Sequence, residues 1–341
     1  MSHILVVDDN LVNLQQIQSQ LSDNYRVSLA KSGKQALQIC SRQMPDCILL
    51  DIDMPEMDGF ETMARLKQNV ILSRIPVIFL TANHDITTEI RALESGAMDF
   101  ITKPFEKSIL IHRIKLHLRF SRYQHYLEDT VKELEDSIVL SFSELIECRD
   151  QNTGGHVQRT STFFELLGRE LQHQGRFTGE LANSELEMMI RAAQLHDIGK
   201  IGISDQILLK PGRLDDEEFE IMKTHAIIGA DILKTMYERT PTQHYLNYAI
   251  MIAGGHHEKY GGGGYPNGIK GENIPLCSRI MAVADVYDAL VADRVYRPAM
   301  SHRDACNIII GGKWVHFDPQ IIDAFEAIHE KLAATAGKKV D

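Results

Sequence analysis

Within the first 119 residues, five short apolar runs alternate with stretches whose apolar residues recur every three or four positions. The apolar runs lie at residues 4–7, 27–29, 47–50, 77–80 and 100–101. The helical patterns lie near residues 11–22, 34–43, 58–69, 86–95 and 106–119. Strands separated by helices of this length form βαβ units, in which the strands pair in parallel and helices cover both faces. The pattern predicts an α/β domain over 1–119 with a five-stranded parallel sheet.

The pattern changes at Phe120, where a long stretch without glycine or proline begins. Its apolar residues are spaced by threes and fours: Phe120, Tyr123, Leu127, Val131, Leu134, Ile138, Phe142 and Leu145. Such a stripe predicts one connecting helix over 120–145 with a heptad-like apolar face. Two interpretations stay open: the helix packs on its own domain, or it pairs with its counterpart in a homodimer and carries a signal.

Beyond about residue 150 the sequence has helical patterns and no convincing series of strands. These patterns lie near 186–200, 215–236, 243–255, 278–293 and 320–334, and glycine-rich loops join them. We therefore expect a mainly α domain over 146–334, followed by a flexible tail over 335–341.

Composition excludes several classes of partner. The formal net charge of −11 argues against general binding to DNA or to an anionic membrane, because both need a basic surface. The five cysteines are scattered without a Cys-x-x-Cys pair, as in a protein whose thiols stay reduced. The chain has neither a signal peptide nor a run of about 18 apolar residues. We expect a cytoplasmic protein.

Polar residues follow the predicted strands directly. Asp8 and Asp9 follow the first strand, Asp51 the third, Thr81 the fourth and Lys103 the fifth. In an open α/β sheet these positions meet at the edge where ligands bind. Converging carboxylates repel one another unless a hard cation joins them, and oxygen ligands favour Mg²⁺. Such a cluster suits attack of a carboxylate on a phosphoryl group, with a lysine and a hydroxyl contacting the phosphate oxygens.

Residues 1–119 resemble the receiver domain of response regulators through LVVDDN, LLDIDMPEMDG, the Thr81-Ala82 pair and the Lys103-Pro104 pair. The resemblance implies a doubly wound sheet of strand order 2-1-3-4-5, phosphorylation of Asp51, and a cognate histidine kinase as phosphodonor. It further implies a Mg²⁺ site and a switch: the Mg²⁺ site would consist of Asp8, Asp9, Asp51 and Asp53, and the switch of Thr81, Phe100 and Lys103.

The second half of the chain is rich in residues that bind metals. The candidates are His156, His196, Asp197, His225, His256, His257 and Asp285. Neutral imidazole and carboxylate suit Mn²⁺, Fe or Zn²⁺. Because seven such residues exceed the needs of one tetrahedral site, two metals fit better, and a two-metal centre suits in-line attack on phosphorus. The glycines at 261–264 follow the histidine pair and let a substrate approach the backbone.

Residues 144–325 resemble the HD-GYP branch of the HD-domain phosphohydrolases. The matching motifs occur in order: TGGHVQR, HDIGKIGI, LLKPGRL, MKTHAIIG, HHEKYGGGGYP, SRIMAVADVYDAL, DRVYR and FDP. This family hydrolyses cyclic di-GMP to linear pGpG and, in some members, to GMP. The resemblance implies that all seven candidates bind metal, with Asp197 as the bridge. It implies His196, Asp197 and Lys200 as catalytic residues, and it implies substrate binding by Lys200, Arg294, Arg297, Tyr265 and Pro266.

Two positions depart from the family pattern. Some members have a glutamate four residues before the first histidine, where it helps to hold a third metal, and this chain has Asn152 there. We therefore predict two metals. The family usually has aspartate before its GYP segment, whereas this chain has Gly261, which we expect to loosen the loop.

Three functions remain in competition. The first is a cyclic di-GMP phosphodiesterase controlled by phosphorylation of Asp51. The second is a binding module that senses the nucleotide or recruits a partner such as a diguanylate cyclase. The third is a phosphohydrolase of another nucleotide, such as a mixed cyclic dinucleotide or a guanosine polyphosphate. The sequence does not determine whether phosphorylation raises or lowers activity.

Overall fold

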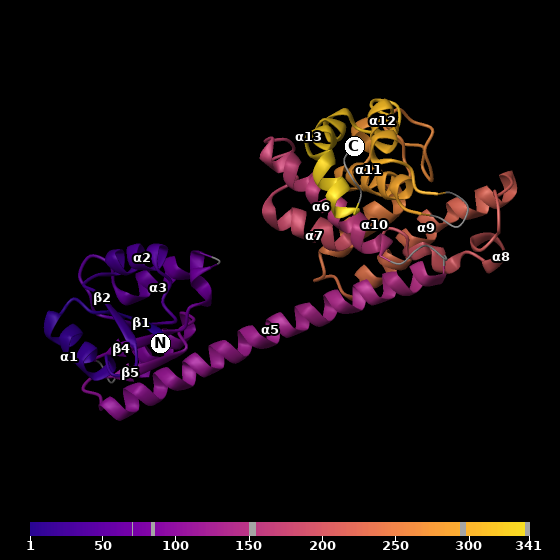
Figure 1. Ribbon diagram of the computed structural model, residues 1–341. Helices are drawn as coiled ribbons and strands as arrows, with labels where there is room; N and C mark the ends of the chain where they lie inside the picture. Colours follow the sequence, from indigo (N-terminus) through magenta and orange to yellow (C-terminus); the bar gives the residue numbers. More distant parts are fainter. Residues whose placement is uncertain (70, 83–85, 150–154, 294–297, 338–341) are drawn as a thin grey trace. The chain divides into compact units, whose positions relative to one another are not determined.

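A computed structural model describes residues 1–69, 71–82, 86–149, 155–293 and 298–337 (Figure 1). The chain divides into two compact units, Met1–Val131 and Lys132–Asp341. No helix among the described residues is both long enough and apolar enough to cross a membrane.

The first unit is built on a five-stranded parallel sheet of strand order β2-β1-β3-β4-β5. Its strands are β1 (His3–Val7), β2 (Arg26–Ala30), β3 (Cys47–Asp51), β4 (Val77–Thr81) and β5 (Asp99–Thr102). The helices between them are α1 (Leu11–Leu21), α2 (Gly33–Arg42), α3 (Gly59–Gln68), the short η1 (Leu72–Arg74) and α4 (Ile86–Glu94). The predicted receiver fold and its strand order are confirmed.

Each strand of this sheet contributes to two separate cores, because successive side chains point to opposite faces. On β1, Leu5 and Val7 belong to the core that also contains Ala36 of α2. Ile4 and Val6 belong to the opposite core, together with side chains of α1 and α5. Burial on both faces explains why the three central strands β1, β3 and β4 are apolar runs, whereas the edge strands β2 and β5 are less buried and carry polar residues.

Helix α5 (Lys107–Arg149) is one continuous helix in place of the two consecutive segments expected from the sequence. The boundary expected near residue 119 therefore lies inside it. Leu110 and Ile114 pack in the core of the first unit, whereas Val139 packs in the core of the second.

The second unit consists of helices and connecting loops, as predicted (Figure 1). Its helices are α6 (His156–His173), α7 (Asn183–Ala193), η2 (Ile198–Gly202), α8 (Asp205–Leu208), α9 (Asp216–Arg239), α10 (Tyr245–Gly255), η3 (Gly271–Asn273), α11 (Leu276–Val291), α12 (His302–Gly311) and α13 (Pro319–Thr335). Helix α11 is buried on almost every side, from Leu276 to Val291, and the other helices pack around it into one core.

Candidate active site

The acidic cluster of the first unit lies where β1 and β3 end. Asp8, Asp9 and Asp51 place carboxylate oxygens within 4.8 Å of one another. The Lys103 ammonium joins two of them, with Nζ 2.7 Å from Asp8 Oδ2 and 2.8 Å from Asp51 Oδ1. Burial raises the pKa of Asp51 to about 6, although Lys103 opposes this shift. The cluster suits a divalent cation, which would add positive charge beside a carboxyl that burial otherwise keeps partly protonated.

The other predicted residues of the first unit lie on β4 and β5 and directly after β3 of the same sheet. Thr81 is buried at the end of β4, beside the strand that carries Asp51. Phe100 is half-buried on β5, where it pairs in register with Phe79 of β4. Asp53 is exposed in the turn after β3.

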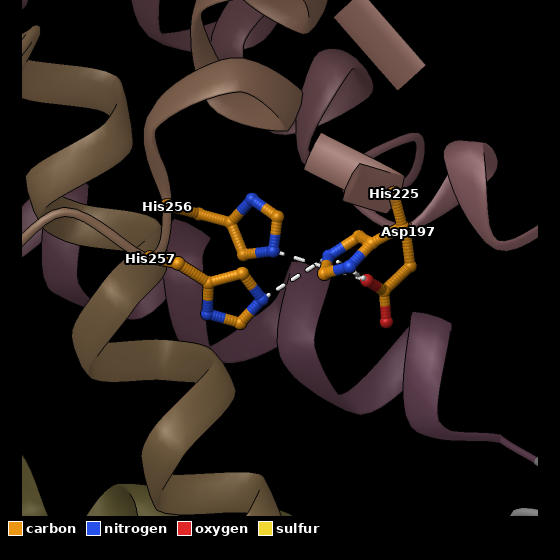
Figure 2. Close-up of side chains that lie close together, drawn as sticks. All are labelled: Asp197, His225, His256 and His257. Carbon is orange, nitrogen blue, oxygen red and sulfur yellow. Dashed lines mark hydrogen bonds and ion pairs between the residues drawn. The ribbon is translucent and has the colours of Figure 1, made fainter. Parts of the chain in front are cut away.

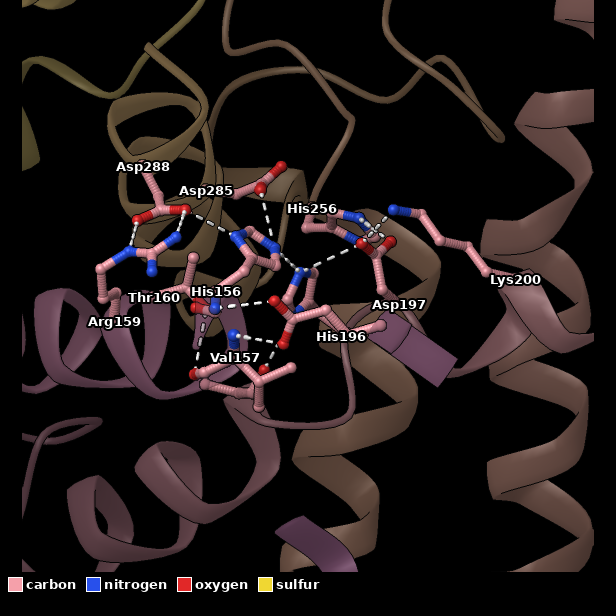
Figure 3. Close-up of polar contacts among 12 residues, drawn as sticks. His156, Val157, Arg159, Thr160, His196, Asp197, Lys200, His256, Asp285 and Asp288 are labelled. Atoms are coloured by element: carbon pink, nitrogen blue, oxygen red, sulfur yellow. Dashed lines mark hydrogen bonds and ion pairs between the residues drawn. The ribbon is translucent and has the colours of Figure 1, made fainter. Parts of the chain in front are cut away.

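In the second unit, all seven candidate metal ligands gather in one place, from α6, α9 and α11, from the turn that follows α10 and from the segment before η2. Asp197, His225, His256 and His257 form a first group, whose potential ligand atoms lie within 4.8 Å of one another (Figure 2). His156, His196 and Asp285 form a second group by the same measure (Figure 3).

The Asp197 carboxylate lies between the two groups. Its Oδ1 is 3.4 Å from His225 Nε2 and 3.8 Å from His256 Nε2, both in the first group. Its Oδ2 is 3.4 Å from His196 Nε2, in the second group. One carboxylate thus presents an oxygen to each group.

Hydrogen bonds fix the orientation of the ligating imidazoles. The Nδ1–H groups of His196 and His225 donate to the carbonyl oxygens of Ala193 and Met222, at 3.0 and 2.7 Å. The Nδ1–H group of His256 donates to the Ile252 carbonyl oxygen at 2.9 Å. Because a carbonyl oxygen can only accept, the proton of each neutral ring is on Nδ1. Its Nε2 lone pair therefore faces the centre of the site, as in metal-binding histidines.

Two pairs of these rings face each other through nitrogen atoms. His156 Nε2 is 3.3 Å from His196 Nε2, and His257 Nε2 is 3.2 Å from His225 Nε2. In the first pair both lone pairs point at each other, because the Nδ1 atoms of both rings carry the protons. Such contacts are repulsive unless a cation lies between the nitrogens. Buried His256 Nε2 likewise has no hydrogen-bond partner among the described residues.

The charge state of the site also favours metal binding. Burial, together with the neighbouring His196, lowers the pKa of His256 to about 4, so its imidazole is neutral at pH 7. Burial works against ionisation of Asp197, but the Lys200 ammonium holds the pKa of this carboxyl well below its usual range. Neutral imidazoles beside an ionised carboxylate are the ligand set of Mn²⁺, Fe and Zn²⁺ sites.

A close contact between η2 and α9 holds Asp197 beside His225. A Cβ atom at Gly199 would lie only 1.9 Å from the His225 carbonyl oxygen and 2.4 Å from Gly229 N. Only glycine allows this approach. It also places Lys200 at the site, where Nζ is 2.7 Å from Asp197 Oδ2.

Asp288, which was not among the residues predicted from the sequence, holds His156 in place. The buried Asp288 carboxylate accepts the Nδ1–H of His156 at 2.7 Å and pairs with Arg159 through both of its oxygens (Figure 3). Although burial works against ionisation, the bonds from His156 and Arg159 lower the pKa of Asp288. Asp288 lies three residues after Asp285, so the two side chains lie on the same face of α11. That spacing was a usable signal in the motif AVADVYDAL.

A second missed residue, Glu147 near the end of α5, caps α6. Its carboxylate is buried and accepts the backbone N–H groups of His156 at 2.8 Å and Val157 at 3.3 Å. These are first-turn N–H groups, which have no partner within their own helix. Gly155, the residue before α6, offers no side chain for this purpose.

The loop after the histidine pair brings Tyr265 against His257, and Pro266 follows Tyr265 in the same loop. The Tyr265 ring stacks on His257, with ring centroids 4.6 Å apart. Phe219 of α9 meets the Tyr265 ring edge-on at 6.4 Å, and Lys223 Nζ lies 5.0 Å from the Phe219 ring centroid. The next residue after Pro266, Asn267, donates its N–H to buried Glu258 at 2.7 Å.

Gly261, which we expected to loosen this loop, is held by the segment before α13. Its N–H donates to the Val315 carbonyl oxygen at 3.0 Å, and Tyr260 N–H donates to the His316 carbonyl oxygen at 3.0 Å. A Cβ atom at 261 would lie 2.9 Å from that Val315 oxygen, so the backbone contact favours glycine. Arg294, Arg297 and Asn152, which the sequence analysis singled out, lie outside the described residues.

The chain matches the response regulator receiver domain family over residues 4–115 and the HD domain family over residues 141–321. A probable cyclic di-GMP phosphodiesterase of Vibrio cholerae is 40% identical over 99% of this chain and 80% of its own length. The cyclic di-GMP phosphodiesterase response regulator RpfG of Xanthomonas campestris pv. campestris is 33% identical over 98% of this chain and 90% of its own length. The 3′3′-cGAMP-specific phosphodiesterase 2 of Vibrio cholerae is 29% identical, over 95% of this chain and 63% of its own length.

Proposed function

Because this chain belongs to the family of response regulators in which an HD domain of metal-dependent hydrolases follows the receiver domain, we propose that it hydrolyses cyclic di-GMP. The observation that carries the proposal is the pair of ligand groups between which the Asp197 carboxylate lies. A two-metal centre of this kind suits hydrolysis of a phosphodiester.

We assign one metal to the first group and the other to the second, with Asp197 as the bridge. The facing Nε2 atoms of His156 and His196, 3.3 Å apart, and of His225 and His257, 3.2 Å apart, support this assignment. When bound, the two metals supply Lewis-acid activation of water and neutralise charge on the phosphate.

The side chains of this chain position the substrate. We assign Lys200 to the scissile phosphate: its ammonium beside Asp197 stabilises negative charge on a phosphate oxygen and is placed to donate a proton to the leaving oxygen. We assign Phe219 and Tyr265 to a guanine base, because the Phe219 ring is 45% exposed beside the Lys223 cation, an arrangement that favours stacking of a nucleobase.

Replacing His196 and Asp197 by alanine tests the catalytic assignment. We expect turnover of cyclic di-GMP to fall by at least about 10³-fold, because the bridge and one ligand of the second group are lost. Hydrolysis is followed by chromatography with the full chain loaded with Mn²⁺, Fe²⁺ or Zn²⁺, so that pGpG and GMP are identified. The control is His173→Ala, whose side chain is 84% exposed and lies outside both groups. Absence of turnover in the metal-loaded wild type would contradict the proposal and favour a nucleotide-sensing module.

A second substrate has support from one relative. The similarity to a 3′3′-cGAMP-specific phosphodiesterase favours testing that mixed cyclic dinucleotide beside cyclic di-GMP. The two nucleotides are compared by kcat/KM in competition with the same metal-loaded enzyme. A higher kcat/KM for 3′3′-cGAMP would replace cyclic di-GMP as the proposed substrate and leave the metal assignment intact.

We further propose that Asp51 accepts a phosphoryl group from a histidine kinase, with Mg²⁺ held by Asp8, Asp9, Asp51 and a carbonyl of Asp53. The convergence of the three carboxylates and the contact of Lys103 with two of them support this assignment. Phosphorylation adds charge and acceptor oxygens beside Thr81, which is how receiver-type switches are driven.

We also propose that α5 pairs with the α5 of a second copy of the chain. Its apolar stripe includes Phe120, Leu127, Leu134, Ile138 and Leu145, each between 43% and 66% exposed. The spacing of threes and fours is that of a coiled-coil seam. Large apolar side chains in a continuous row are rarely left in water, so the exposed stripe favours a homodimer over packing on the helix's own domain.

A further inference from the structure

A second cluster of metal-binding side chains lies between α12 and α13, apart from the ligand groups described above. His302 and Cys306 lie one turn apart on α12, and His329 comes from α13. Their ligand atoms lie within 4.8 Å of one another. His302 and Cys306 are buried, whereas His329 is partly exposed, so an ion can reach the cluster from solvent. We propose that these three residues bind a zinc ion that joins α12 to α13.

The distances among the ligand atoms match a zinc site. His302 Nε2 is 3.0 Å from His329 Nδ1 and 3.4 Å from Cys306 Sγ. Tetrahedral zinc, with bonds of about 2.05 Å to nitrogen and about 2.3 Å to sulfur, separates two nitrogens by about 3.3 Å and nitrogen from sulfur by about 3.6 Å. Cys306 Sγ is also 3.6 Å from His302 Nδ1, so the thiol lies beside both ring nitrogens, and zinc on Nε2 would require the Cys306 side chain to turn toward that atom.

The surroundings orient His302 as a ligand. The Tyr287 hydroxyl of α11 is fully buried and lies 2.9 Å from His302 Nδ1. When Nδ1–H donates to this hydroxyl, the lone pair is on Nε2, which faces His329 and Cys306. A hydrogen-bond partner on the far nitrogen is the usual companion of a metal-binding histidine.

The thiol distinguishes this cluster from the other two groups of the unit. His and Asp supply every ligand of those groups, whereas Cys306 offers sulfur, which selects zinc over Mg²⁺ or Mn²⁺. Three protein ligands leave a fourth position for water, which the partial exposure of His329 allows. The ion would tie α12 and α13 together and, through Tyr287, support α11, the helix that carries Asp285 and Asp288.

Cobalt serves as the probe, because Co²⁺ takes zinc sites and a thiolate ligand gives it a charge-transfer band in the near ultraviolet. Co²⁺ is titrated into the full chain in phosphine reductant, without substrate, so the result is independent of the proposed activity. We expect the band to saturate in wild type and in the control Cys148→Ser, whose thiol is exposed on α5. Cys306→Ser should lose the band, and His329→Ala should weaken Co²⁺ binding at the thiol by at least about tenfold. Addition of Zn²⁺ to the Co²⁺-loaded wild type should remove the charge-transfer band, because Zn²⁺ displaces Co²⁺ from the thiolate.

Absence of the band in wild type, or its persistence in Cys306→Ser, would overturn the proposal and leave the cluster a hydrogen-bonded network. The wild-type result does not depend on how well any variant folds. Elemental analysis for metals other than Mg²⁺ gives a second readout: the wild type should hold three such ions per chain and Cys306→Ser two, both of them in the proposed active site. Equal metal contents in the two proteins would also contradict the zinc site.

Discussion

In the second unit, a hydrogen bond at Nδ1 determines which ring nitrogen each ligating histidine directs toward the metal site. Three Nδ1–H groups donate to backbone carbonyls, and the His156 Nδ1–H donates to Asp288. The three carbonyl groups belong to the backbone of helices, so no side-chain mutation removes them. Asp288, by contrast, is a side chain that mutation can remove, which makes His156 the ligand whose orientation is most easily tested.

Asp288→Asn removes the negative charge that holds His156 and Arg159 and leaves the side-chain shape almost unchanged. We expect metal affinity of the second group to fall about 10- to 100-fold, because the partners of ligating histidines contribute to affinity on this scale. Isothermal titration with Mn²⁺ measures the change, and circular dichroism verifies folding. The control Asp231→Asn makes the same charge change at an exposed position of α9. Unchanged Mn²⁺ affinity in Asp288→Asn would show that Asp288 does not position His156.

The sequence predicted the residues that gather at the site better than those that hold them. His196, Asp197, His225, His256 and His257 stand in recognisable motifs, and the structure brings them together. Glu147 acts on His156 from a different helix and looks in the sequence like any other acid on a polar helix face. Its role depends on where α6 begins, and tertiary packing sets that point. Short-range spacing carries no information about such a contact.

At the scale of elements, α5 ends directly against the site. Glu147 caps α6 at His156, and Arg149 donates to the carbonyl oxygens of Ile201 and Ile203, just after Lys200. The last turn of α5 therefore contacts the start of α6, which carries the ligand His156. It also contacts the segment after Lys200, the lysine assigned to the phosphate. A rotation or shift of this turn would change the hydrogen bonds of both segments.

Continuity of α5 was readable from the sequence, because no glycine or proline occurs between residues 105 and 149. The sequence analysis placed a domain boundary at residue 119, where the strand-helix alternation ends. A change of pattern was therefore interpreted as a change of element, although no helix-breaking residue accompanies it. The sheet and its order were predicted correctly because both depend on local periodicity and family resemblance.

Leu134→Glu tests the proposed pairing of α5. We expect the change to halve the mass measured by light scattering, from twice 38.6 kDa to 38.6 kDa, because a charge in the seam is desolvated and repelled by its counterpart. The control Lys132→Glu introduces the same side chain at an exposed position outside the stripe. A wild type that is monomeric at micromolar concentration would refute the dimer.

At the scale of the whole molecule, the two units contain sites for different chemistry on one chain. Lys103 links Asp8 and Asp51 in the first unit, and Asp197 lies between two ligand groups in the second. Asp99 of β5, next to Phe100, accepts bonds from Arg113 and His117 of α5. The strand that carries the proposed switch residue is thereby tied to α5, the helix whose last turn carries Glu147.

Phosphorylation at Asp51 should change turnover of the full chain. Beryllofluoride with Mg²⁺ mimics the phosphoryl group, and Asp51→Asn should abolish its effect because the acceptor carboxylate is gone. Rates of cyclic di-GMP hydrolysis with and without beryllofluoride give the sign and size of control. Equal rates in the wild type would show that the receiver does not regulate the HD domain, without bearing on the catalytic assignment.

The backbone-bonded imidazoles also determine how the site responds to acid. Since Nδ1 already carries a proton in His196 and His256, a further proton can add only at Nε2, the atom assigned to the metal. Protons and metal ions therefore compete for the same lone pairs, and each ring exchanges one for the other. Acidification should empty the centre by ion exchange at fixed ligand positions. Return to neutral buffer that contains the metal ion should then refill the site without refolding of the protein.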